Sequence, residues 1–300
     1  MRRTFPAALS LLFLLISAAP TLWAEEDPGS ISHWTLRVFL GPNYQNLSDL
    51  NAGAIGLTGI VMLQEGLYGH QQLFRPAHWG FEIGADLVYE LTSNVGIGVG
   101  TGFFLTGRST TLDGFRIYPP YDTLVSYSIR PRSGVIPLRA AVYISFPFGP
   151  STRIVVNAGP ELEFASIGLD VESRFLDWAW EQHEKASGIA LGIQAGVGFE
   201  KRFSSWATLF VEVRGRAANL RELSGSHRLS NTRGFDEAAD GPLYYWADST
   251  YGVFHGNPHI PFPLIGVQAV PPSGTYISDV RRATVDLSGA SVLAGLIFRF

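Results

Sequence analysis

The 300-residue chain contains no cysteine, which excludes disulfide bonds, thiol catalysis and thiolate metal sites. Charged residues make up only 16% of it. Beyond an apolar run near the start, no segment approaches the ~20 apolar residues that a membrane-spanning helix needs. Arg2 and Arg3 account for two of the 22 basic residues, so the rest of the chain carries 20 basic against 26 acidic residues. This mildly acidic balance disfavours nucleic acid as a partner.

The first two dozen residues have the organisation of a secretory signal peptide. Arg2 and Arg3 precede an apolar run over 7–19, and Leu22, Trp23 and Ala24 lead into an acidic stretch, although Leu22 is larger than the residue usual at that place. The alternative is an uncleaved anchor, for which the apolar run is short. We therefore expect export, and the absence of a later membrane helix leaves secreted, periplasmic and outer-membrane destinations.

The segment 288–300 shows the pattern around which we expect the fold to be organised. Every second residue in it is apolar, while the residues between are mixed, small or charged. Such a strand has two different surroundings, and lipid is the simplest cover for its apolar row. That row ends in Leu296, Phe298 and Phe300, which we interpret as an assembly signal.

Seven further segments alternate in the same way. The clearest is 79–91, where an apolar row opposes Glu82, Asp86 and Glu90, so the second face must be wet. Alternating glycines in 96–102 are predicted to oppose these inward residues across a tight turn. The predicted strands are 34–43, 79–91, 95–103, 138–146, 154–164, 189–200, 209–216 and 288–300.

Short turns alternate with four long connections, over 46–78, 107–134, 167–187 and 219–286. The first is predicted to be a loop with one helix near 57–67, with a further hairpin as the alternative. Whether 47–77 or 220–285 adds a hairpin stays open. Outer-membrane barrels combine an even number of ~10-residue strands, short periplasmic turns and long external loops. The pattern predicts an all-β transmembrane antiparallel up-and-down β-barrel of eight strands with long extracellular loops.

Three features are similar to the small eight-stranded outer-membrane β-barrel superfamily, the class of the OmpA transmembrane domain. They are the segment 135–138, the glycine-rich segment 95–103 and the end 298–300. The resemblance implies an outer-membrane monomer that contacts outer-membrane lipids and lipopolysaccharide, the barrel-assembly machinery and an unknown extracellular ligand, without a cofactor. The expected parts are a signal peptide over 1–24, a short periplasmic leader over 25–32 and an outer-membrane β-barrel domain over 33–300.

The inward faces of the predicted strands carry charges of both signs. An eight-stranded barrel is just wide enough inside for side chains, and an unpaired ion there costs several kcal/mol. We therefore expect the charges to pair and fill the lumen. Strand register places Arg139 opposite Glu161, or Glu163 if Pro160 forms a bulge. The predicted lumen charge network is Arg37, Glu82, Asp86, Glu90, Arg139, Glu161, Glu163, Glu200, Glu212, Arg214, Arg216 and Arg299.

These patterns favour a non-enzymatic barrel with a filled lumen and a structural or surface recognition or adhesion role for its long loops. The stretch 243–257, rich in Tyr, Trp, Asn and Gly, suits a contact surface. The alternatives are a small-solute, porin-like channel and a lipid A-modifying barrel enzyme. No catalytic, metal or cofactor residue is predicted, because no histidine is fixed near a serine and a carboxylate by register. The run Glu181-Gln182-His183-Glu184 also lacks the second histidine of a helical zinc motif.

Overall fold

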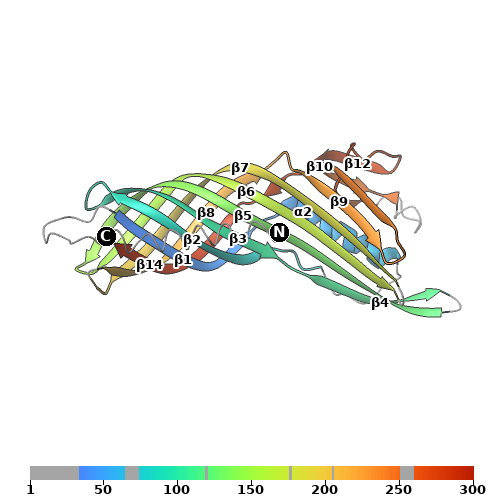
Figure 1. Ribbon diagram of the computed structural model, residues 1–300, viewed down its shortest axis with the longest axis horizontal. Coiled ribbons are helices and arrows are strands. Elements are labelled where there is room, and N and C mark those ends of the chain that lie inside the picture. The colour runs from blue at the N-terminus through green and yellow to red at the C-terminus, as the bar shows by residue number, and fades with distance from the viewer. Residues whose placement is uncertain (1–33, 65–73, 119–120, 176–177, 205, 251–259) are drawn as a thin grey trace.

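The computed structural model describes residues 34–64, 74–118, 121–175, 178–204, 206–250 and 260–300. These residues form one antiparallel, fourteen-stranded sheet and a helix, so the all-β antiparallel part of the prediction is confirmed (Figure 1). Residues 1–24 and 25–32, the expected signal peptide and leader, lie outside the described residues. No helix in the described part is long and apolar enough to cross a membrane.

Eight of the strands each pair along their length with two antiparallel neighbours. Pairing runs in the order β1, β2, β3, β5, β6, β7, β8, β14 and then returns from β14 to β1, and we call this arrangement the eight-strand circuit. Its members are β1 (Trp34–Gln45), β2 (Trp79–Glu90), β3 (Val95–Gly107), β5 (Tyr121–Gly149), β6 (Thr152–Phe175), β7 (Trp178–Arg202), β8 (Ala207–Leu220) and β14 (Gly289–Arg299).

The remaining elements lie at one end of this circuit, where the strands among them extend the sheet (Figure 1). They are α2 (Ser48–Gln64), β4 (Thr110–Tyr118), β9 (Ser224–Asn231), β10 (Asp236–Asp248), β11 (Phe262–Val267), β12 (Ile277–Arg282) and β13 (Val285–Asp286). The predicted number of eight strands is therefore wrong for the described residues. The stretches expected to be loops over 107–134, 167–187 and 219–286 are largely strands, whereas 47–77 contributes the helix and no described hairpin.

The physical reason for these missed strands is an inverted alternation. On the extensions of β5, β6 and β7, apolar side chains such as Ile129, Ile167 and Ala186 are buried, and polar side chains such as Asp170 and Lys185 lie outside. A search for apolar rows that face lipid does not recognise such segments. Each of the eight predicted segments, by contrast, coincides with or overlaps a strand of the eight-strand circuit.

The register of β2 and β3 agrees with the prediction, since the glycines of β3 pair with inward residues of β2. Gly100 lies opposite Asp86 and Gly102 lies opposite Gly84. A Cβ atom at Gly100 would lie 1.9 Å from Oδ1 of Asp86, so glycine is what leaves room for the carboxylate. The expected bulge at Pro160 is absent, because β5 and β6 keep the same register on both sides of it and shift only between Pro147 and Gly149.

Helix α2 begins at a set of side-chain contacts to the segment before β14. The Ser48 hydroxyl donates to the carbonyl of Thr284, and Asp49 accepts two hydrogen bonds from the guanidinium of Arg281 at 2.6 and 2.9 Å. These bonds raise the pKa of Arg281 above its ordinary value. A carboxylate in the first turn is also favoured by the helix dipole.

The helix is apolar on most sides because it is enclosed. Leu50 and Ala54 are buried in one apolar cluster with residues of β5, β6, β7, β11 and β13. Close packing on β11 requires glycine, since a Cβ at Gly56 would lie 1.8 Å from the carbonyl oxygen of Pro263. The helix therefore packs an apolar core against one end of the eight-strand circuit.

Candidate functional site

The outward face of the eight-strand circuit carries large exposed apolar side chains. On β7, Ile189, Leu191 and Ile193 are 60%, 76% and 67% exposed. We call the whole set the apolar belt: Leu40, Trp79, Phe81, Ile97, Val99, Leu138, Val142, Ile144, Phe146, Ile154, Val156, Phe164, Ile189, Leu191, Ile193, Val197, Phe199, Leu209, Val211, Val213, Val292 and Leu296.

The apolar belt ends abruptly along the long strands. On β7 the outward residues are apolar from Ile189 to Phe199, whereas the preceding outward positions are Glu181, His183, Lys185 and Ser187. Aromatic pairs mark both limits of the belt. Trp34 lies beside Tyr89 at one limit, with ring centroids 4.9 Å apart, and Tyr44 lies beside Trp79 at the other, at 5.5 Å.

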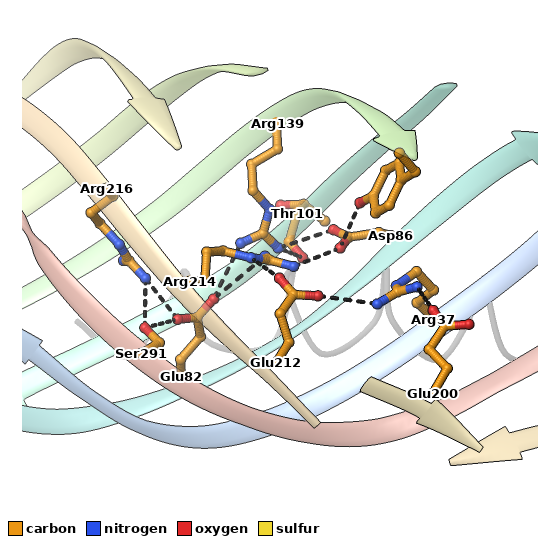
Figure 2. A network of polar contacts seen from close by, with 11 residues as sticks. Arg37, Glu82, Asp86, Thr101, Arg139, Glu200, Glu212, Arg214, Arg216 and Ser291 are labelled. Carbon is orange, nitrogen blue, oxygen red and sulfur yellow. Dashed lines mark hydrogen bonds and ion pairs between the residues drawn. The ribbon is translucent and has the colours of Figure 1, made fainter. Parts of the chain in front are cut away.

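Inside the circuit, Asp86 on β2 is a central acceptor (Figure 2). Its carboxylate lies 3.1 Å from Nη2 of Arg214 on β8 and 3.3 Å from Nη2 of Arg139 on β5. The hydroxyl of Tyr143 donates to it at 3.1 Å. Three strands are thus joined across the interior by one buried carboxylate.

Glu82, two inward positions away on the same strand, ties the network to one further strand, β14. Its carboxylate accepts hydrogen bonds from Nη1 of Arg139 at 3.2 Å, Nη2 of Arg216 at 2.7 Å and the hydroxyl of Ser291 at 2.5 Å. Nη1 of Arg214 lies 4.0 Å away. Glu82 is completely buried, so its charge is compensated by these groups and not by solvent.

Arg37 on β1 continues the chain of charges toward the opposite end (Figure 2). It pairs with Glu200 and, at 3.0 Å, with Glu212, whose other oxygen accepts from Nε of Arg214 at 2.7 Å. Arg153 donates to Glu200 at 2.5 Å. We call the connected set the ionic network: Arg37, Glu82, Asp86, Arg139, Arg153, Glu200, Glu212, Arg214 and Arg216.

Aromatic rings fill the space between these charges. The guanidinium carbon of Arg37 lies 4.4 Å from the ring centroid of Phe210, and that of Arg216 lies 3.5 Å from the ring centroid of Phe104. Both rings are buried. Cation–π contacts of desolvated guanidinium groups are worth about 2 kcal/mol, so the rings stabilise the buried cations as well as excluding water.

The remaining predicted charges lie around the ionic network. Glu90 is 3.8 Å from Nη2 of Arg153, and Arg299 donates to the hydroxyl of Thr208 at 2.8 Å. Glu161 and Glu163 are buried, and neither has an ion-pair partner within 4.0 Å among the described residues. Both oxygens of Glu163 also lack a hydrogen bond within that part of the chain.

The predicted ion pair of Arg139 with Glu161 or Glu163 is wrong, although the register on which it rested is confirmed. The Cα atoms of Arg139 and Glu161 are partners across β5 and β6. The guanidinium instead reaches across the interior to Glu82 and Asp86. Sequence reasoning also missed Arg153, which lies beside a turn, and Ser291, which is inward but uncharged.

Two features close the interior. At the end near the β2–β3 turn, the cavity beside Arg37, Glu90 and Arg153 has a volume of about 20 Å³, which is room for water only. At the opposite end, the apolar cluster around α2 lies beyond Glu163, with Phe104, Ala165 and Ala190 in it.

The histidines and the Glu181–Glu184 run do not form a catalytic or metal constellation in the described residues. His183 is outside, where Nδ1 lies 2.9 Å from Asp170, whereas Glu184 is buried inside and contacts Nδ1 of His227. His78 stacks on Tyr44. Among the described residues no group of three potential ligands is arranged to hold a metal ion.

The fold and these interior contacts define an all-β protein, and comparison with known proteins adds little at the level of family. No family model matches the chain, and no curated protein matches it. Among solved structures, the chain is similar to the outer membrane protease OmpT from Escherichia coli, with 10% identity and a TM-score of 0.26. That match covers 93% of this chain and 100% of the other. None of these comparisons shows the OmpA-like family.

The prediction that this chain is not an enzyme is contradicted by this match, because the matched protein is a protease. We therefore withdraw that prediction. A TM-score of 0.26 transfers neither a substrate nor a catalytic residue to this chain.

Proposed function

We propose that the eight-strand circuit is a transmembrane β-barrel of a bacterial outer membrane, closed to solutes, that anchors a folded domain on the outer side. The observation that carries this proposal is the outward face of β7, apolar from Ile189 to Phe199 and polar from Glu181 to Ser187. A transmembrane strand needs about 9–11 residues, which is the length of that apolar stretch.

The alternative is that the whole apolar belt is exposed to water, which would be energetically costly. Each exposed Å² of apolar surface costs about 25 cal/mol, and soluble monomers rarely expose contiguous apolar patches beyond a few hundred Å². The apolar belt draws members from β1, β2, β3, β5, β6, β7, β8 and β14, so it surrounds the circuit. Lipid covers such a surface without a partner protein.

The orientation follows from the lengths of the connections. The β2–β3 and β5–β6 turns are short, while the extensions of β5, β6 and β7 with α2 and β9–β12 lie at the opposite end (Figure 1). Outer-membrane barrels carry short turns on the periplasmic side and their large connections outside. The extended end, which we call the outer domain, therefore faces the exterior, and it is the surface on which recognition of other molecules would occur.

The ionic network and the core around α2 support a closed barrel over a porin-like channel. A continuous path for ions would require Arg37, Arg139 and Arg214 to leave carboxylates with which they are buried. Breaking one such buried pair costs about 3–5 kcal/mol. Several would have to open together, and the apolar core beyond them adds a second barrier to hydrated ions.

Recording from planar lipid bilayers tests the closed barrel. The purified, folded protein is expected to give no stable conductance, and the double variant Arg139→Ala/Arg214→Ala is expected to leak more than the native protein. A matched control removes an exposed arginine of the outer domain, Arg228→Ala. Stable single-channel conductance of the native protein that scales with bulk salt would contradict the proposal and favour the channel.

A further inference from the structure

The outer domain contains a cavity of about 360 Å³ that is separate from the ionic network. Its walls come from α2, β5, β6, β7, β9, β10 and β11. Leu57 and Val61 contribute from the helix, Leu169 from β6, and the rings of Trp180 and Trp246 from β7 and β10. No residue of the ionic network lines it.

Its size distinguishes this cavity from a packing defect. Protein interiors are close-packed and contain few voids larger than a water molecule. The side chains around it include the buried Leu169 and Ile265, so the walls belong to the packed core of the outer domain. Ligand pockets occupy roughly 300–1,000 Å³, are mostly apolar and aromatic, and carry a few placed polar groups. The cavity fits this description.

The polar side chains that line the cavity include Gln182, Asp248 and Ser173, and the hydrogen bonds of the first two show which of their atoms remain for a ligand. Nε2 of Gln182 donates to Oε1 of Glu184 at 2.9 Å, and Glu184 is held by the N–H of Val267 at 2.8 Å. The amide oxygen and the second N–H of Gln182 are therefore left for a ligand. Asp248 accepts the N–H of Thr250 on Oδ1 at 2.7 Å, which leaves Oδ2.

The Gln182 oxygen and Oδ2 of Asp248 are hydrogen-bond acceptors, whereas the hydroxyl groups of Ser173 and Tyr127 can act in either sense. A ligand carboxylate or phosphate would be repelled by Asp248 and would find no cation among the lining residues. A hydroxyl or amine donor is complementary to both acceptors. The size sets the apolar body, because a cavity of about 150 Å³ holds benzene, and 360 Å³ therefore holds a bicyclic ring system or a medium-length alkyl chain.

We propose that this cavity is a binding site for a small apolar molecule, bicyclic or alkyl, that carries a hydroxyl or amine donor and no anionic group. The site goes beyond the proposed membrane function and does not depend on it, since every wall residue lies in the outer domain. Binding would place the donor between Gln182 and Asp248 and the apolar body between α2 and the two tryptophans.

The absence of native cysteine allows a direct occupancy test. Ser173→Cys places a single thiol in the cavity wall, and Ser226→Cys places one on the exposed surface of β9 as the matched control. The measured quantity is the rate of modification by methyl methanethiosulfonate, with and without 2-naphthol. We expect saturating 2-naphthol to slow modification at position 173 at least tenfold and to leave position 226 unchanged. 2-Naphthoate at the same concentration should protect neither.

Partition of 2-naphthol into detergent would affect the reaction rates of both thiols alike. It therefore cannot account for slower modification at position 173 alone. Equal rates at position 173 with and without 2-naphthol would overturn the proposal. Failure of that thiol to react at all in the folded protein would also overturn it, because the cavity would then be closed even to the small reagent. Equal protection by 2-naphthoate would overturn the assigned ligand class.

A second test of the proposed binding site fills the cavity with a larger side chain. Val171→Trp, in the Ser173→Cys background, puts an indole into the cavity and should abolish protection by 2-naphthol, whereas Val213→Trp on the apolar belt should leave it intact. If Val171→Trp does not fold, Asp248→Asn tests the proposed ligand class instead. That variant should reduce the preference for 2-naphthol over 2-naphthoate at least fivefold, and an unchanged preference would refute the assigned role of Asp248.

Discussion

Replacing either of two buried glutamates, Glu82 and Glu163, by glutamine should change the free energy of unfolding by very different amounts. Glu82 compensates Arg139 and Arg216 at 3.2 and 2.7 Å and accepts from Ser291. Glu163 is equally buried, yet both of its oxygens lack a hydrogen bond among the described residues. Glutamine has nearly the same shape as glutamate, so Glu82→Gln and Glu163→Gln isolate the effect of charge from that of volume.

The expected magnitudes follow from what each carboxylate compensates. Glu82→Gln leaves two guanidinium groups short of a buried anion, and breaking a buried pair in this way costs about 3–5 kcal/mol. Glu163→Gln removes no ion pair and places a neutral amide where an ionised carboxylate would be costly, so the free energy of unfolding should change by less than about 1 kcal/mol or increase. The two variants should differ by at least about 2 kcal/mol.

Urea-induced unfolding of the protein in lipid vesicles, followed by tryptophan fluorescence, measures this difference. The comparison uses the free energy from the midpoint and slope of each transition, provided that the slopes agree. If Glu163→Gln destabilises the protein as much as Glu82→Gln does, Glu163 takes part in a buried charge network that the described contacts do not contain, and the reasoning fails.

Two further substitutions test packing and the contacts that hold the start of α2. Gly100→Ala should lower the free energy of unfolding by about 1–3 kcal/mol, because the new methyl group would displace the Asp86 carboxylate, whereas Gly215→Ala has open space and should have little effect; equal effects in urea unfolding would contradict this. Asp49→Asn should cost about 1 kcal/mol, a value reduced because Arg281 is partly exposed, and should speed amide exchange in the first turn of α2. Unchanged exchange in that turn would refute the role of Asp49 in holding the start of α2.

Much of the eight-strand circuit could be predicted from the sequence because its period-two alternation is a local property of the chain. The glycines of β3 illustrate this, since alternation and a tight turn suffice to place Gly100 opposite Asp86. The extensions of β5, β6 and β7 could not be recognised in the same way. Their apolar rows face α2 instead of lipid, and that inversion depends on a helix supplied by a distant segment.

The ion-pair partners of the interior charges could not be predicted from the sequence for a related reason. Alternation correctly indicates that Arg139 faces inward, and register correctly places Glu161 beside it on the next strand. A long guanidinium side chain is not limited to neighbouring strands, however, and Arg139 reaches Glu82 on β2. The 360 Å³ cavity was likewise hidden, because its walls meet only when α2 and β11 pack together.

Cysteine labelling along β7 tests most directly whether the apolar belt is covered by lipid. Lys185→Cys and Ile193→Cys both introduce an outward-facing thiol at an exposed position into a chain that has no other. In outer-membrane vesicles, a water-soluble, membrane-impermeant maleimide should label Lys185→Cys rapidly and Ile193→Cys only after the protein has been unfolded. Equal labelling of the two thiols in the folded protein would show that water reaches the belt and would contradict the proposed transmembrane barrel.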